Sequence, residues 1–189
     1  LLRIKKRLTQ PPGCVITRLR VNKQEGISQM ATRARIGIEL ADGTVKTSYH
    51  HWDGYPAGLG FNLVNNWTAE DKLAEAIELG DASHWADTIG EKTDFDVRDD
   101  NYYKQNVYYH RDRGEPRVNT SPIVYDSYAV FEKTFMRNQP AGEDYAYVLR
   151  LDGTFTQLHP YTEEVKHDAE DSIRAEAARM QRLIDQEAA

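Results

Sequence analysis

The chain has 189 residues, of which 40% are hydrophobic and 29% are charged, and its formal net charge is −6. This composition is typical of a folded protein with one domain or slightly more, and it excludes an intrinsically disordered chain. No apolar stretch approaches the ~20 residues that a membrane-spanning helix needs, and the single cysteine, Cys14, excludes an internal disulfide. We therefore expect no membrane association and a location in a reducing cytoplasm.

The first 29 residues differ from the rest of the chain in charge. They contain seven Lys or Arg and one Glu, a net of +6, whereas the remaining residues carry a net of −12. They lack strand or helix periodicity, and a well-patterned strand follows Met30 at once. We expect Met30 to be the natural start, residues 1–29 to be a translated leader, and residues 30–189 to form a single domain. The alternative is a flexible basic arm that binds nucleic acid or a partner.

The first patterned segment predicts a hairpin. Residues 33–40 alternate apolar and polar side chains, Asp42-Gly43 follows, and residues 44–51 alternate again. Asp-Gly is a favoured pair for a tight turn of two residues. Such a turn would place Ile38 opposite Thr47.

Two helices are expected after this hairpin. Leu59, Leu63 and Trp67 recur every four residues, which predicts a first helix. Residues 68–71, Thr-Ala-Glu-Asp, have the form of a capping box, so a second helix should begin there and end near Gly80.

The middle of the chain is less regular. Residues 81–101 are acidic and weakly patterned, which predicts a loop with short turns. Residues 101–109 are rich in Tyr and Val and predict a strand, whereas residues 123–135 predict a strand followed by a helix.

The C-terminal third predicts a second hairpin and a long helix. Residues 145–151 and 154–158 flank another Asp-Gly pair, and both faces of this hairpin are apolar, as in a covered sheet. Thr162 is a suitable N-cap for the helix. The helix would carry one apolar stripe, Val165, Ala169, Ile173, Ala177, Met180 and Ile184.

These elements together predict an α+β fold. We expect a mainly antiparallel sheet built from the Asp-Gly hairpins, with helices on one face and a long amphipathic C-terminal helix. That helix would pack on the sheet or join two copies of the chain in a homo-oligomer.

The stretch Tyr49-His50-His51-Trp52-Asp53-Gly54-Tyr55-Pro56 holds more chemically capable side chains than any other part of the chain. Strand alternation places His51 on the apolar face of its strand and His50 on the polar face. The two adjacent histidines are therefore expected to have different roles.

A second polar cluster, His110-Arg111-Asp112-Arg113-Gly114-Glu115, follows the strand expected at residues 101–109. If the two strands are neighbours, both clusters meet at one sheet edge around a common hollow. Guanidinium groups offer paired donors to phosphate, and aromatic rings offer a stacking face for a base. The alternative is a solvated network of mutually paired charges. We expect a small anionic, nucleotide-like ligand to contact His51, Trp52, Asp53, Tyr55, His110, Arg111, Arg113 and Glu115.

Several motifs support a family resemblance. These are the opening hairpin of residues 30–49, the Tyr49-x-His51-Trp52-Asp53-Gly54-Tyr55-Pro56 motif with Gly60, the Ala76-Ile77-x-Leu79-Gly80-Asp81-x-Ser83 motif, and residues 109–115. In these the chain resembles a group of small, functionally uncharacterised bacteriophage and prophage proteins. The resemblance covers about residues 30–116 and implies a phage accessory protein in a bacterial cytoplasm, acting in counter-defence or host takeover. It implies no reaction.

Two other functions remain open. His51, Asp53, His110 and Asp112 are ligand types for a divalent metal and candidates for acid–base catalysis in a hydrolase. They lack the spacing of known metal or nucleophile motifs, so we favour binding over catalysis and assign neither a metal site nor a cofactor.

The third function is an acidic inhibitor that mimics nucleic acid or blocks a basic host protein. The net charge of −12 after residue 29 supports it and argues against direct nucleic acid binding by residues 30–189.

Overall fold

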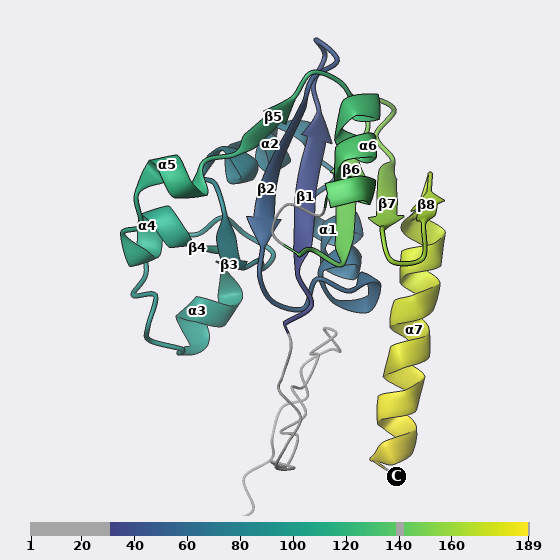
Figure 1. Ribbon diagram of the computed structural model, residues 1–189. Coiled ribbons are helices and arrows are strands. Elements are labelled where there is room, and N and C mark those ends of the chain that lie inside the picture. The colour runs from purple at the N-terminus through teal and green to yellow at the C-terminus, as the bar shows by residue number, and fades with distance from the viewer. Residues whose placement is uncertain (1–30, 139–141, 189) are drawn as a thin grey trace, which may run out of the picture. The chain divides into compact units, whose positions relative to one another are not determined.

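The computed structural model describes residues 31–138 and 142–188, all of which belong to one structural unit. The expectations for residues 1–29 lie outside this range. The described residues build an eight-stranded sheet in the order β4-β3-β2-β1-β6-β7-β8, with β5 also paired to β2 (Figure 1). The strands are β1 Ala34–Glu39, β2 Val45–His50, β3 Ala82–His84, β4 Val107–Tyr108, β5 Ile123–Tyr125, β6 Tyr145–Leu149, β7 Phe155–His159 and β8 Glu164–Lys166.

The helices connect these strands. They are a short π-helix, η1, at Pro56–Gly60, followed by α1 Phe61–Asn66, α2 Glu70–Glu78, α3 Asp100–Lys104, α4 Tyr109–Arg113, α5 Arg117–Thr120, α6 Tyr128–Asn138 and α7 Glu170–Glu187. Among the strand pairs of the described residues, β1–β6 and β2–β3 are parallel and the others are antiparallel. The α+β fold with a mainly antiparallel sheet and a long C-terminal helix is therefore confirmed.

Both Asp-Gly hairpins have a turn that is one residue longer than expected. The Leu40 amide donates to the Thr44 carbonyl, so the loop spans three residues, with Gly43 at φ 85°. The Asp42 carboxylate accepts bonds from the backbone N–H and the hydroxyl of Thr44, which stabilises this geometry. Residues 150–154 repeat the same contacts in the second hairpin.

The longer turn shifts the strand register by one residue. Ile38 lies opposite Lys46, not Thr47, and Ile36 lies opposite Ser48. Because alternate side chains point to opposite faces, the face that carries Ser48 and His50 now packs toward the main core.

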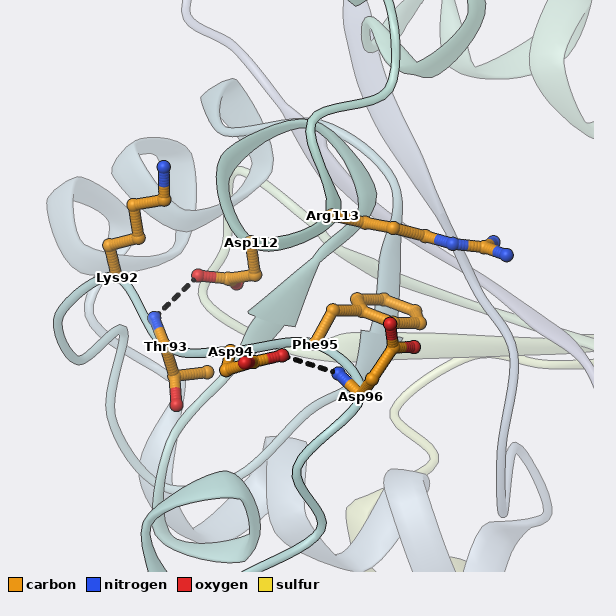
Figure 2. Close-up of a pocket in the computed structure, with 7 residues that line it drawn as sticks. All are labelled: Lys92, Thr93, Asp94, Phe95, Asp96, Asp112 and Arg113. Carbon is orange, nitrogen blue, oxygen red and sulfur yellow. Dashed lines mark hydrogen bonds between the residues drawn. The ribbon is translucent and has the colours of Figure 1, made fainter.

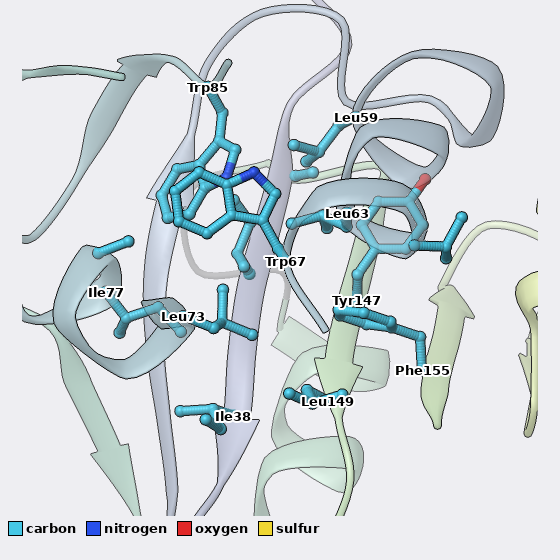
Figure 3. Close-up of a cluster of buried hydrophobic side chains, with 14 of the residues drawn as sticks. Ile38, Leu59, Leu63, Trp67, Leu73, Ile77, Trp85, Tyr147, Leu149 and Phe155 are labelled. Carbon is cyan, nitrogen blue, oxygen red and sulfur yellow. The ribbon is translucent and has the colours of Figure 1, made fainter. Parts of the chain in front are cut away.

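The main core lies between one face of the sheet and the helices α1, α2 and the start of α7. Trp67 and Trp85 pack at 5.2 Å between ring centroids, and Tyr147 and Phe155 come from the sheet (Figure 3). The remaining members include the buried apolar side chains Ile38, Leu59, Leu63, Leu73, Ile77 and Leu149.

A smaller core on the opposite face corrects the expectation that the helices share one face. Phe131 and Phe135 of α6 pack against Val45, Val148 and Leu158 of the sheet. The central strands have apolar side chains on both faces, so each face requires a cover.

Two segments differ from their sequence-based predictions. The strand expected at residues 101–109 is helix α3 followed by the short β4, because the Asp99 carboxylate accepts bonds from the amides of Asn101 and Tyr102 and caps the helix. The C-terminal helix begins at Glu170 and not after Thr162, because Glu164–Lys166 pairs with β7 as strand β8.

The outer half of α7 has few contacts. Ile173 is its only buried residue, whereas Met180 and Leu183 are 39% and 45% exposed. Self-association through this helix remains a prediction. Among the described helices, none is both long enough and apolar enough to traverse a bilayer.

Candidate ligand-binding site

The first predicted cluster forms a corner at the end of β2. The His51 amide donates to the Ala82 carbonyl at 3.2 Å, which fixes the backbone beside β3. The Nδ1 atom of His51 lies 2.6 Å from the Tyr49 hydroxyl, and its ring meets Trp52 edge-on at 4.7 Å between centroids. His51 and Trp52 are both half-buried, so each keeps part of its surface available to a ligand.

The loop after this corner is held by its main chain. The Gly54 amide donates to the Thr32 carbonyl at 2.8 Å, and the buried Tyr147 hydroxyl donates to the Gly54 carbonyl at 3.0 Å. A Cβ at position 54 would lie 2.8 Å from the Cβ of Ala34, so a glycine is required there. These contacts tie the loop to β1 and β6 and thereby fix the position of Trp52.

Asp53 and Tyr55 flank this glycine. Asp53 is exposed and has a φ of 59°, and Tyr55 is half-buried, with its ring against Gly58. Within residues 31–138 and 142–188, neither side chain forms a hydrogen bond with another group. Both therefore remain candidates for ligand contact.

His50 has the separate role expected of it, but it is buried and not on a solvated face. Its side chain is 2% exposed, and its Nε2 bonds to the carbonyl of Trp52. Burial is the main cause that lowers the pKa of His50 to about 3, and the neighbouring His84 and His51 add to the shift. His50 is therefore neutral, and its bond to the Trp52 carbonyl supports the loop.

Two arginines that were not among the predicted site residues act on His51. Burial lowers the pKa of His51, and the positive charges of Arg33 and Arg98 lower it further. Arg33 precedes β1, and Arg98 lies in the loop before α3 with its guanidinium 4.7 Å from the ring centroid of Tyr102. In the part of the chain that the structure describes, neither guanidinium forms an ion pair with a carboxylate.

The second predicted cluster is helix α4 and the turn that follows it. Arg111 uses all five of its N–H donors inside the protein. It bonds to the carbonyls of Ile89, Gly90 and Asn106, and it makes two bonds with the carboxylate of Asp112. Asp112 is buried. Arg111 therefore joins three segments of the chain and has no donor left for a ligand.

The rest of this cluster is more open. Arg113 pairs with Glu115 at 2.9 Å and lies 5.0 Å from the ring centroid of Phe95, and Nδ1 of His110 bonds to the Glu115 carbonyl at 2.7 Å. A hollow of about 550 Å³ lies beside Arg113 (Figure 2). Both bases and acids line it: Lys92, Thr93, Asp94, Phe95, Asp96, Asp112 and Arg113.

The two clusters lie two strands apart. His50 of β2 pairs with Ala82 of β3, which in turn pairs with Tyr108 of β4. A small core of Phe95, Tyr102 and Val107 lies beside β4, with Tyr103 and Tyr109 packed on it. No residue from Tyr49 to Pro56 lines the hollow at Arg113.

No hydrogen bond or ion pair among the described residues joins the predicted residues of the first cluster to those of the second. Asp81 connects the segments that carry them, because its carboxylate accepts from the Tyr49 amide at 2.8 Å and its carbonyl accepts from the Tyr109 amide at 3.0 Å. The structure thus provides two neighbouring corners, each with its own arginines.

The described residues offer no metal centre. No group of three or more His, Cys, Asp or Glu side chains in this part of the chain is arranged to hold an ion. Both oxygens of Asp112 already accept bonds, from the amides of Thr93 and Tyr108 as well as from Arg111. Compared with protein-family models, curated proteins and solved structures, the chain gives no match to any of the three.

Proposed function

We propose that the chain binds a small anionic, nucleotide-like ligand at the corner formed by His51, Trp52, Arg33 and Arg98. The observation that supports this most directly is the pair of guanidinium charges that act on one half-buried imidazole without a carboxylate partner in the described residues. Guanidinium groups prefer to bind carboxylate or phosphate in paired hydrogen bonds. An anion from solution would supply the negatively charged partner that these two arginines lack among the described residues.

The aromatic residues of the corner suit the rest of a nucleotide. The Trp52 ring is half-buried beside His51, and its indole can stack on a base. Asp53 and Tyr55 lie on the adjacent loop with side chains that make no hydrogen bonds among the described residues. They can recognise the polar edges of a base or a sugar.

The biological setting is proposed from the resemblance to phage proteins alone. In that setting the protein would bind a nucleotide that a bacterial host produces and would limit its effect. Such a role needs binding without turnover.

A binding assay with matched variants tests the proposal. We would screen mono-, di- and cyclic nucleotides by thermal shift and measure the dissociation constant of any hit by calorimetry. Arg98→Ala should weaken binding by about 10- to 100-fold, because a hydrogen bond to a charged group contributes about 1.5–3 kcal/mol. Arg98 is exposed, so the fold should tolerate this change.

The control is Arg179→Ala, which removes the same charge from the exposed side of α7. It should leave the dissociation constant within about twofold, because exposed charges at long range are largely screened by salt. A nucleotide that binds equally well to both variants would refute the site. A screen with no binding nucleotide would refute the function.

A further inference from the structure

The loop that carries Trp52, Asp53 and Tyr55 has a fixed backbone. The Leu59 amide donates to the Asp53 carbonyl at 2.9 Å, and a Cβ at Gly58 would lie 2.5 Å from the same carbonyl oxygen. That Cβ would also lie 3.0 Å from the Tyr55 ring, so the Asp53 main chain and the Tyr55 ring meet at one glycine. The backbone therefore sets where these three side chains leave the loop.

Asp53 carries a carboxylate that its own turn does not require. The residue is exposed and has a φ of 59°, a left-handed conformation that a glycine adopts without cost. In the first hairpin turn, the Asp42 carboxylate accepts two bonds from Thr44 and stabilises its turn. The Asp53 carboxylate accepts no hydrogen bond from the described residues, so its acceptor oxygens are left for a ligand.

A carboxylate at this corner restricts how an anionic ligand is oriented. It only accepts hydrogen bonds, and it repels other negative charges. In the proposed complex the phosphate therefore lies away from Asp53, and Asp53 contacts a part of the ligand that donates. Trp52 is the preceding residue, and its half-buried indole is a stacking face for a base. One ligand can thus contact both consecutive side chains.

Guanine is the base whose edge matches a single carboxylate. Its N1–H and its N2 amino group are adjacent donors, one for each carboxylate oxygen. Adenine and cytosine offer one amino donor beside a ring nitrogen that accepts, and uracil offers one N–H between two carbonyl oxygens. Those acceptors would face the carboxylate and repel it, so these bases leave one carboxylate oxygen without a donor.

We propose that Asp53 is the specificity-determining residue of this corner and that its carboxylate selects guanine, with the base stacked on Trp52. This inference rests on the proposed function, and it narrows the ligand to a guanine nucleotide. The two adjacent hydroxyls of ribose are another pair of neighbouring donors, so the probes must separate the sugar from the base.

Four probes do so by calorimetry at pH 7.5: GMP, AMP, IMP and 2′-deoxy-GMP. The dissociation constant of GMP should be at least about tenfold below that of AMP, because paired hydrogen bonds to a base edge discriminate by about that factor. IMP lacks the N2 amino group and should bind more weakly than GMP, whereas 2′-deoxy-GMP should match GMP within about twofold. AMP that binds as tightly as GMP, or 2′-deoxy-GMP that binds as weakly as AMP, overturns the inference.

Asp53→Asn tests the carboxylate itself. An asparagine amide offers one acceptor and one donor, which suits adenine, and asparagine tolerates the left-handed backbone. The ratio of the AMP dissociation constant to the GMP dissociation constant should fall about tenfold. Damage to the fold would raise both constants by the same factor and leave their ratio unchanged. An unchanged ratio in a variant that still binds both nucleotides refutes the role of Asp53.

Asp126→Asn is the matched control. Asp126 is exposed and follows Tyr125, which pairs with Val45 at the start of β2, whereas Asp53 follows the end of that strand. The control should leave both dissociation constants within about twofold. A ratio that falls equally in both variants would show that charge and not contact selects the base, and would overturn the inference.

The outcomes of the two proposals can be told apart. If no nucleotide binds, the proposed function fails together with this inference. If GMP and AMP bind equally well and Arg98→Ala weakens both, the binding site stands and the selection of guanine by Asp53 is refuted.

Discussion

Replacing Arg111 with alanine should destabilise the fold instead of removing a ligand contact. Its guanidinium holds three backbone carbonyls, at Ile89, Gly90 and Asn106, together with the carboxylate of Asp112. The Asp112 side chain is fully buried, and the Arg111 side chain is 16% exposed. Loss of the guanidinium leaves a buried carboxylate without its counter-charge and three carbonyls without their donor.

The expected cost is about 3 kcal/mol of unfolding free energy. Removing one partner of a buried ion pair typically costs about 3–5 kcal/mol. The lower end applies because the amides of Thr93 and Tyr108 continue to donate to the Asp112 carboxylate. For a domain of this size, such a loss lowers the melting temperature by about 6–12 °C.

Arg113→Ala is the matched control, two positions along the same helix. Its side chain is 52% exposed and pairs with Glu115, so the expected cost is about 0–1 kcal/mol. Urea unfolding monitored by circular dichroism measures both variants, and an unchanged m-value would show that the difference lies in stability. Equal costs for the two substitutions would refute the distinction between a structural Arg111 and a peripheral Arg113.

Three further outcomes follow from single contacts. Burial, the largest cause, raises the pKa of Asp81 from 3.8 to about 6. Between these two values the folded state holds a proton that the unfolded state has released. The fold therefore becomes more stable, by about 1.3 kcal/mol, as the pH falls from 7 to 5. Asp81→Asn should therefore raise stability at pH 7, and its advantage over the unsubstituted protein should shrink by that amount at pH 5; a gap independent of pH in urea unfolding would contradict this. Asp99→Ala removes the N-cap of α3 and should cost about 1 kcal/mol in the same assay, more than the substitution of the exposed Asp100. Gly80→Ala should lower the melting temperature by several degrees, because Gly80 has φ 93° and a Cβ there would lie 2.1 Å from the Thr120 carbonyl oxygen; an unchanged melting temperature would show that the turn relaxes freely.

The sequence predicted the local elements better than the way they fit together. Both hairpins, α2, the β5–α6 segment and the long C-terminal helix follow from turn residues and from periodicity, which act within a few positions of the chain. The register did not follow, because the Asp-Gly pair alone does not distinguish a two-residue turn from a three-residue turn. The signal was the threonine after each glycine, Thr44 and Thr154, whose hydroxyl and amide both bond to the turn aspartate.

The remaining differences come from long-range pairing. Residues 164–166 have a helical pattern in isolation, but β7 offers an open edge that pairs with them as a strand. The arginines whose charges lower the pKa of His51 come from segments about 20 residues before it and about 50 residues after it, and no local pattern connects them. Arg98 lies in an acidic stretch for which the sequence predicted a loop, so it was not considered as a site residue. Asp99, the next residue, could have been recognised as the N-cap of α3.

The cap also engages the carboxylate of Asp99, which therefore does not pair with Arg98 before it. Asp99 points its carboxylate into the first turn of α3, where it accepts bonds from the amides of Asn101 and Tyr102. Arg98 instead lies over the Tyr102 ring, and its charge acts on His51. Arginines elsewhere in the described chain are paired where they are buried, as Arg111 is with Asp112, or are solvated where they are exposed. Arg98 is exposed and Arg33 is half-buried, and neither has an ion-pair partner among the described residues, so an anion bound from solution at this corner would contact cations that the protein leaves unpaired.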